Sequence, residues 1–121
     1  MKLQETRSIT ASQAHEYEVL QPLLSALYDE FQELSKKKPQ EPVSKGKVKV
    51  VNRVLEPVID LLDAEPQRKF LDALDDDDLP QNSDVVLMLG QALTAMQSFR
   101  SRYYHGLAGW RVGDDTEDEQ E

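Results

Sequence analysis

Apolar residues recur every three or four positions in several stretches of this chain, which is the spacing of one helix face. The first stretch begins at Ser12, the expected N-cap, and ends near Lys38, because Pro39 prevents continuation. Its apolar set is Leu20, Leu23, Leu24, Leu27, Phe31 and Leu34. Pro22 lies inside this pattern and removes a backbone donor, so we expect a kink or a fresh start there.

A second helical pattern starts at about Ser44, after a connector that contains two prolines. Its apolar residues again share one face: Val48, Val51, Leu55, Val58, Ile59 and Leu62. Their period is nearer to that of a helix than to that of a strand, despite the several valines. Pro57 lies within this segment and predicts a bend near residues 53–56.

Two further segments follow. Residues 66–74 predict a short helix with proline at its first position. A longer helix runs from Ser83, its expected N-cap, to about His105, with Gly106 as its C-cap. Between Val85 and Met96 the apolar residues occur on most sides of this helix, which is typical of a central element.

Together these segments predict an all-α protein, a compact bundle of about four helical segments with proline bends. The 121 residues suit a single domain, which we place at residues 12–112. We expect residues 1–11 to be loosely ordered and residues 113–121 to form a disordered acidic tail.

The chain contains no cysteine, which excludes disulfides and thiolate metal sites and fits a reducing compartment. No apolar run is long enough to span a bilayer, and the first residues lack the apolar core of a signal peptide. The sequence therefore predicts a cytoplasmic protein that does not associate with membranes.

The formal net charge is −9, from 23 acidic and 14 basic residues, and this excess of acids disfavours general nucleic-acid binding. The charges are unevenly distributed. Seven of the 14 basic residues lie between Lys36 and Arg53, opposed there by Glu41 alone, whereas acids gather at residues 72–78 and in the tail. Such a charge dipole selects partners and orientations, so we expect a protein partner.

Three of these basic residues, Lys45, Lys49 and Arg53, are four positions apart and should line one face of the second helix. Such a face can follow a phosphate backbone or bind an acidic protein. It can also be a solvated face that neutralises acidic segments of the same chain, which is the simpler interpretation. No aromatic residue lies among the lysines, so stacking on single-stranded nucleic acid is not supported.

The stretch RSRYYH, residues 100–105, holds a second candidate site. His105 can move a proton near neutral pH, and Arg100 can stabilise the charge of a phosphate, which together suffice to cleave RNA without a metal. The pair resembles the Arg-x4-6-His signature of the HEPN superfamily, small helical bundles that often act as ribonucleases. The resemblance covers these six residues only, and it implies an active site formed across a dimer. Ser101 stands where that family often has a polar amide or an acid.

The same two residues have a simpler interpretation. Arg and His are favoured in the last turn of any helix, because their charge complements the helix dipole. The chain has six arginines, and a histidine at one of three permitted spacings arises readily by chance. We favour a helix terminus over a nuclease, and a protein that is not an enzyme.

Aspartates between the third and fourth segments could supply oxygen ligands to calcium or magnesium: Asp72, Asp75, Asp76, Asp77, Asp78 and Asp84. An EF-hand loop that starts at Asp75 fails, because Leu79 takes a ligand position and Pro80 replaces the glycine. His15, the other histidine, belongs to no Glu-x-x-His pair. We expect no metal and no cofactor.

Trp110 lies beyond the last capped helix, where it either folds back onto the bundle, as we favour, or anchors a partner. With Lys45, Lys49 and Arg53 it completes the predicted binding residues. The sequence therefore predicts a small, non-enzymatic helical interaction or regulatory protein of accessory, immunity or antitoxin type. The alternatives are a HEPN-like ribonuclease that uses Arg100 and His105 and a nucleic-acid-binding accessory module; a homodimer is left open.

Overall fold

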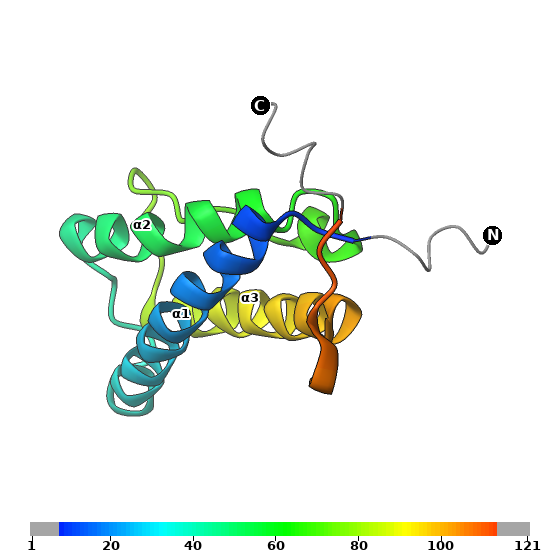
Figure 1. The fold of residues 1–121 in the computed structure, drawn as a ribbon. Helices are drawn as coiled ribbons and strands as arrows, with labels where there is room; N and C mark the ends of the chain where they lie inside the picture. Colours follow the sequence, from blue (N-terminus) through cyan, green and yellow to red (C-terminus); the bar gives the residue numbers. More distant parts are fainter. Residues whose placement is uncertain (1–7, 114–121) are drawn as a thin grey trace.

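Three α helices and a C-terminal hairpin make up residues 8–113, the part of the chain that the computed structural model describes (Figure 1). The helices are α1 (Ala11–Lys37), α2 (Lys45–Leu61) and α3 (Asn82–Tyr103), and the 3-10 helix η2 (Pro66–Phe70) follows α2. Strands β1 (Tyr104–His105) and β2 (Gly109–Trp110) flank the short 3-10 turn η3 (Gly106–Ala108). The expectations for residues 1–7 and for the acidic tail at 114–121 lie outside the described residues.

The structure is mainly helical, as the apolar pattern predicts. Three α helices are present in residues 8–113, where four helical segments were expected. The short helix expected at residues 66–74 is the 3-10 helix η2, and residues 71–74 are not helical. A small two-stranded sheet, which the pattern did not indicate, follows α3. Among the described helices none combines the length and the apolar character needed to cross a membrane.

The N-cap of helix α1 lies two residues earlier than expected. Its N-cap is Thr10 rather than Ser12, because the Thr10 hydroxyl accepts from the Gln13 N–H while the Gln13 side chain accepts from the Thr10 N–H. This reciprocal pair satisfies two backbone donors that a single serine cap would not. Helix α1 then continues through Pro22 without a fresh start, and α2 likewise continues through Pro57.

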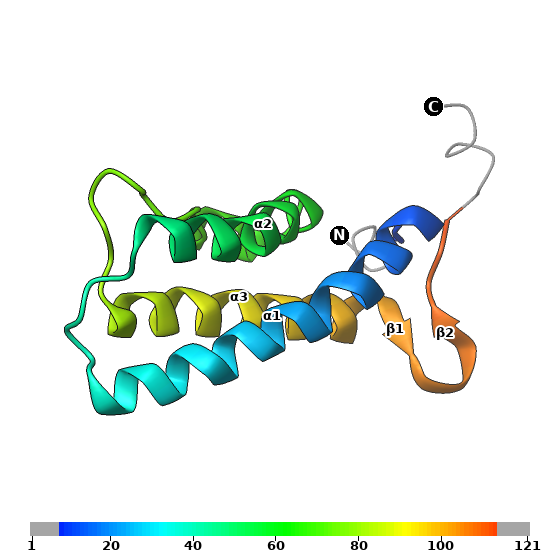
Figure 2. The same ribbon diagram turned by 90° about the vertical axis from the view of Figure 1, so that its left-hand side faces the viewer.

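The core lies where α1 crosses α3 and α2 runs beside α3 (Figure 2). Each helix contributes one line of apolar side chains, as the periodicity predicts. The largest fully buried side chains include Leu24, Leu55, Leu62, Leu89, Phe99 and Tyr103. The segment Val48–Val58 is helical and places Val48, Val51 and Val58 in this core, so the valines form no strand.

A side chain of α2 fixes the long loop that leads to α3. The Asn52 amide nitrogen donates to the Leu74 carbonyl, and the Asn52 carbonyl oxygen accepts from the Leu74 N–H, both at 2.9 Å. Because one side chain satisfies both backbone groups of Leu74, it replaces the partners that a helix would supply.

Helix α3 begins at Asn82 and ends at Tyr103, short of the expected end at His105. The next residue, Tyr104, leaves the helix and pairs across the hairpin with Trp110. Gly106 is therefore not the C-cap of α3; it lies in the hairpin turn, where it has a φ of +29°. Gly109 has a φ of +78°, a backbone conformation that glycine adopts without steric cost.

The two ends of the described chain meet in a short parallel bridge between Ile9 and Val112. The Ile9 N–H donates to the Arg111 carbonyl at 3.1 Å, and the Gly113 N–H donates to the Ile9 carbonyl at 2.8 Å. Ile9 itself is buried in the core. The hairpin is thus attached both to α3, from which it emerges, and to the segment before α1.

Candidate functional site

Lys45, Lys49 and Arg53, called the basic face below, lie along the solvent side of α2. All three side chains are exposed, and the buried residues Val48, Val51 and Leu55 lie on the opposite side of the helix. Within residues 8–113 none of the three forms an ion pair. The basic face therefore presents to solvent three cations that have no ion-pair partner in the described part of the chain.

Two acidic residues continue the line of the basic face toward the end of α2. Glu56 follows Arg53 by three residues and Asp60 follows by another four, so helical geometry places them on the same side. Both are exposed. The solvent side of α2 is therefore basic in its first half and acidic in its second.

The cations in the first turn of α2 oppose the helix dipole. The first turn of α2 contains Lys45 and Lys47 and no acidic residue. Cations near the positive end of a helix cost about 0.3–1 kcal/mol each when exposed, where acids would stabilise it by a similar amount. Gly46 weakens the same turn further, because it has low helix propensity. The start of α2 is thus not optimised for folding stability.

Trp110 folds back onto the helices and packs in an aromatic cluster. Its ring lies 5.0 Å from Tyr17 of α1 and 5.2 Å from Tyr104, measured between centroids, and both contacts are edge to face. Phe99 of α3 stacks on Tyr17 at 5.8 Å. The indole Nε1–H donates to the Glu18 carboxylate at 2.8 Å. The half-buried ring is engaged within its own chain, and a role in binding a partner stays a prediction.

Arg100 and His105 lie on different elements, although the sequence predicted that one helix would carry both. Arg100 is on α3, where its guanidinium lies 4.1 Å from the centroid of the Tyr104 ring. His105 is exposed on β1, and within the described chain no hydrogen bond or ring contact joins it to Arg100. Burial raises the pKa of Tyr17 above its ordinary value of 10.0, and the nearby Arg100 charge offsets only part of this rise.

The acidic loop brings three carboxylates together. Oxygens of Asp75, Asp76 and Asp77 lie within 4.8 Å of one another, in a loop that is largely exposed. The Asp77 N–H donates to the Asp75 carboxylate at 2.8 Å, the hydrogen bond of an Asx turn. Asp84 lies apart from them and accepts from the Gln81 N–H at the start of α3. The aspartates thus shape a turn and a helix start.

Sequence reasoning missed one buried polar contact. The Tyr103 hydroxyl donates to the Glu65 carboxylate at 2.9 Å, and the Arg102 guanidinium lies 3.6 Å from the other carboxylate oxygen. The Glu65 side chain is only 4% exposed. Nothing in the local pattern around Glu65 distinguishes it from its exposed acidic neighbours, because its partners come from the far end of α3.

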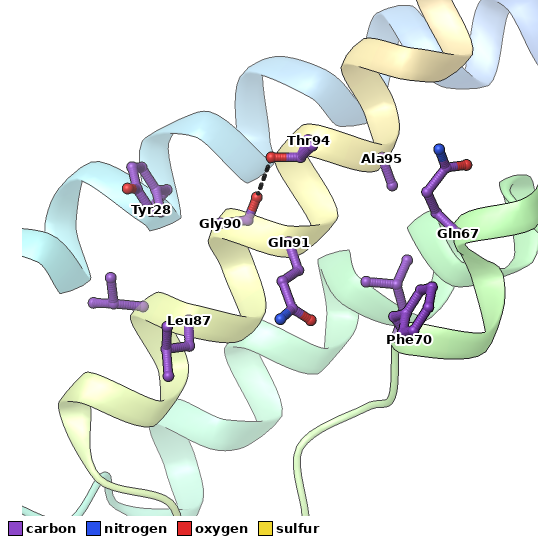
Figure 3. A pocket seen from close by; sticks show the side chains of 10 residues that line it. Tyr28, Gln67, Phe70, Leu87, Gly90, Gln91, Thr94 and Ala95 are labelled. Carbon is purple, nitrogen blue, oxygen red and sulfur yellow. Dashed lines mark hydrogen bonds between the residues drawn. The ribbon is translucent and has the colours of Figure 1, made fainter.

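A second feature missed in the sequence is a shallow groove over α3, with a volume of about 550 Å³ (Figure 3). Leu87, Gly90, Gln91 and Thr94 form its floor, and Tyr28 lies on one side. On the other side lie residues from η2 and beyond: Gln67, Phe70 and Leu71. The sequence did indicate an unusual helix here, because no charged residue occurs between Asp84 and Arg100.

A scan against protein-family models finds no match, and searches of curated proteins and of solved structures return no significant one. The structure places Lys45, Lys49 and Arg53 together on one side of α2. Trp110 lies on β2, and Arg100 and His105 lie on α3 and β1.

Proposed function

We propose that this protein is a non-enzymatic interaction protein that binds an acidic protein partner through the basic face of α2. One observation carries the proposal: Lys45, Lys49 and Arg53 are exposed in a line and form no ion pair within residues 8–113. Carboxylates on a partner would supply the missing opposite charges. A regulatory role of accessory, immunity or antitoxin type fits this mode of binding.

The unfavourable start of α2 supports this proposal. A solvated face with no partner gains nothing from cations at the positive end of a helix dipole, whereas a binding face does. A partner carboxylate near Lys45 would interact with the lysine and with the helix N-terminus together. The acidic second half of the same side, Glu56 and Asp60, would repel a partner docked in the reverse direction.

Charge and size favour a protein over a nucleic acid. The basic face extends from residue 45 to residue 53, about 12 Å along the helix, which is enough for only a few phosphate contacts. Glu56 and Asp60 then follow on the same side, where a phosphate backbone would be repelled. The net charge of −9 opposes a polyanion at longer range.

The test compares two variants that lose the same number of charges. One carries Lys45→Gln, Lys49→Gln and Arg53→Gln; the control carries Lys36→Gln, Lys37→Gln and Lys38→Gln at the end of α1 and just beyond it. Partners captured from the source cell should be lost with the first variant and retained with the control. Binding of the purified partner should also weaken as salt is raised.

A partner retained equally by both variants would exclude the basic face as the binding site. Duplex DNA is the competing probe in the same assay. If the wild type bound DNA with a steep salt dependence and captured no protein through the basic face, the nucleic-acid-binding alternative would replace the proposal.

A further inference from the structure

Helix α3 has a solvent-facing side without charge, called the outer face below and formed by Leu87, Gln91, Thr94, Ser98 and Ser101. No charged residue occurs from Val85 to Phe99, although α3 lies partly on the surface. Exposed sides of helices normally carry charges, whereas the centres of protein interfaces are depleted of them. Leu87 is 66% exposed and Phe70, beside the groove, is 61% exposed.

The outer face is hollowed along most of its length. The groove of about 550 Å³ covers its first half, and a second hollow of about 470 Å³ covers the rest. Thr94 lines both. The second hollow is lined by small or polar side chains: Thr94, Gln97, Ser98, Ser101 and Arg102. The exposed Leu87 thus lies in one half of the outer face, and the second hollow, over Ser98 and Ser101, lies in the other.

The spacing along the outer face is that of a helix-pairing seam. Asp84, Leu87, Gln91, Thr94, Ser98 and Ser101 are separated alternately by three and four residues. If two copies of α3 lie antiparallel, with the two-fold axis between residues 92 and 93, each of these positions meets another. Leu87 then faces Ser98 of the second copy, and Gln91 faces Thr94 of the second copy.

This pairing matches shape and charge at once. Leu87 enters the hollow over Ser98 of the second copy. Leu87 of the second copy enters the hollow over Ser98 of the first, as a two-fold interface requires. Asp84, at the start of α3, meets Ser101 and the adjacent Arg102 of the second copy, whose side chain is 41% exposed while its guanidinium also lies 3.6 Å from Glu65 of its own copy. Opposite charges therefore meet at both ends of an otherwise uncharged seam.

We infer that the outer face of α3 binds a second copy of this chain, with the two helices antiparallel, in a two-fold symmetric dimer. The inference goes beyond the proposed function, because it uses α3 rather than the basic face of α2. It also bears on the ribonuclease alternative. Two Arg100 residues in this dimer lie about 22 Å apart along the helices, so the pairing does not join them in one site.

The first test is the mass in solution, by light scattering after gel filtration. The wild type should have about twice the 13.8 kDa of one chain. Leu87→Glu should weaken the dimer on the order of tenfold or more, because it places a charge in the seam. Leu23→Glu is the matched control, since Leu23 is 48% exposed on α1 and outside the outer face.

The second test uses the absence of cysteine from the chain. Gln91→Cys and Gln97→Cys each introduce one thiol on the exposed side of α3. In the antiparallel pair the two Cys at position 91 are about 4.5 Å apart along the axis, and those at 97 about 13.5 Å. Mild oxidation should therefore link Gln91→Cys into a covalent dimer and leave Gln97→Cys unlinked.

Three outcomes would overturn the inference: a monomeric wild type, a dimer that Leu87→Glu does not weaken, or equal crosslinking at both cysteines. Circular dichroism of Leu87→Glu separates loss of pairing from loss of folding. Partner capture through the basic face should survive Leu87→Glu, and the dimer should survive neutralisation of Lys45, Lys49 and Arg53. The two proposals can therefore fail independently, and the two measurements show which one has failed.

Discussion

The Trp110 indole donates a hydrogen bond to the Glu18 carboxylate at 2.8 Å, and this contact joins the C-terminal hairpin to α1. The same ring packs edge to face against Tyr17 and Tyr104. Trp110 thus joins two distant parts of the chain, in addition to the Ile9–Val112 bridge. The contribution of its packing can be separated from that of its hydrogen bond.

Trp110→Ala should lower the free energy of unfolding by about 2 kcal/mol, because it removes a half-buried ring from the aromatic cluster. Glu18→Gln should cost less than about 1 kcal/mol, since a neutral acceptor remains in an exposed hydrogen bond. Urea denaturation of both variants measures the two values. Equal losses would mean that the hydrogen bond, rather than the ring, holds the hairpin.

Replacing the cations at the start of α2 should stabilise the protein, and the change at Lys45, which belongs to the basic face, should also weaken partner binding. Lys45→Glu and Lys47→Glu should each raise the free energy of unfolding by about 0.3–1 kcal/mol, because acids suit this end of the dipole. Lys36→Glu and Lys37→Glu, in the last turn of α1, should lower it by a similar amount. Thermal denaturation at low salt compares the pairs, and destabilisation by the α2 changes would contradict the dipole argument.

Stability should fall at alkaline pH through Tyr17. Burial raises the pKa of Tyr17 in the folded protein above its ordinary value of 10.0, so the unfolded chain releases this proton first. The tyrosine contribution is therefore fully present below pH 10.0 and is lost as the pH rises toward the folded pKa. Urea unfolding measured across this range should show a smaller decline for Tyr17→Phe than for the wild type.

Under the proposed function, we expect that Arg100 and His105 do not cleave RNA. Wild type and His105→Ala, each incubated with total RNA and EDTA, should leave the RNA equally intact. Metal-independent cutting by the wild type that disappears in His105→Ala would instead establish the ribonuclease alternative. Gel electrophoresis of the RNA after incubation distinguishes the two results.

The helical character of the chain was predictable because the buried residues of α1 and α2 follow one period. Leu24 and Phe31 in α1 and Val48 and Leu55 in α2 all came from the apolar spacing alone. The basic face followed from the same geometry, since residues four apart on a helix must share a side.

The ends of the helices were less predictable, because distant or reciprocal contacts decide them. Thr10 displaces Ser12 as N-cap through its exchange with Gln13. Helix α3 ends before His105 because Tyr104 pairs with Trp110, a partner that the local sequence does not reveal.

The outer face of α3 was missed for a different reason. Leu87 counts as a core residue in any apolar pattern, yet it is 66% exposed because no other element of the described chain covers it. A pattern can show that a side chain is apolar, but only the packing shows whether the chain itself buries it.

The bridge between Ile9 and Val112 closes a loop that contains almost all of the described chain. Closing so long a loop is entropically costly until the helices between its ends are packed. The bridge should therefore be the final contact made as the chain folds, and the first to open in local fluctuations of the native state. Its amide protons, on Ile9 and Gly113, should then exchange with solvent well before those at the centre of α3.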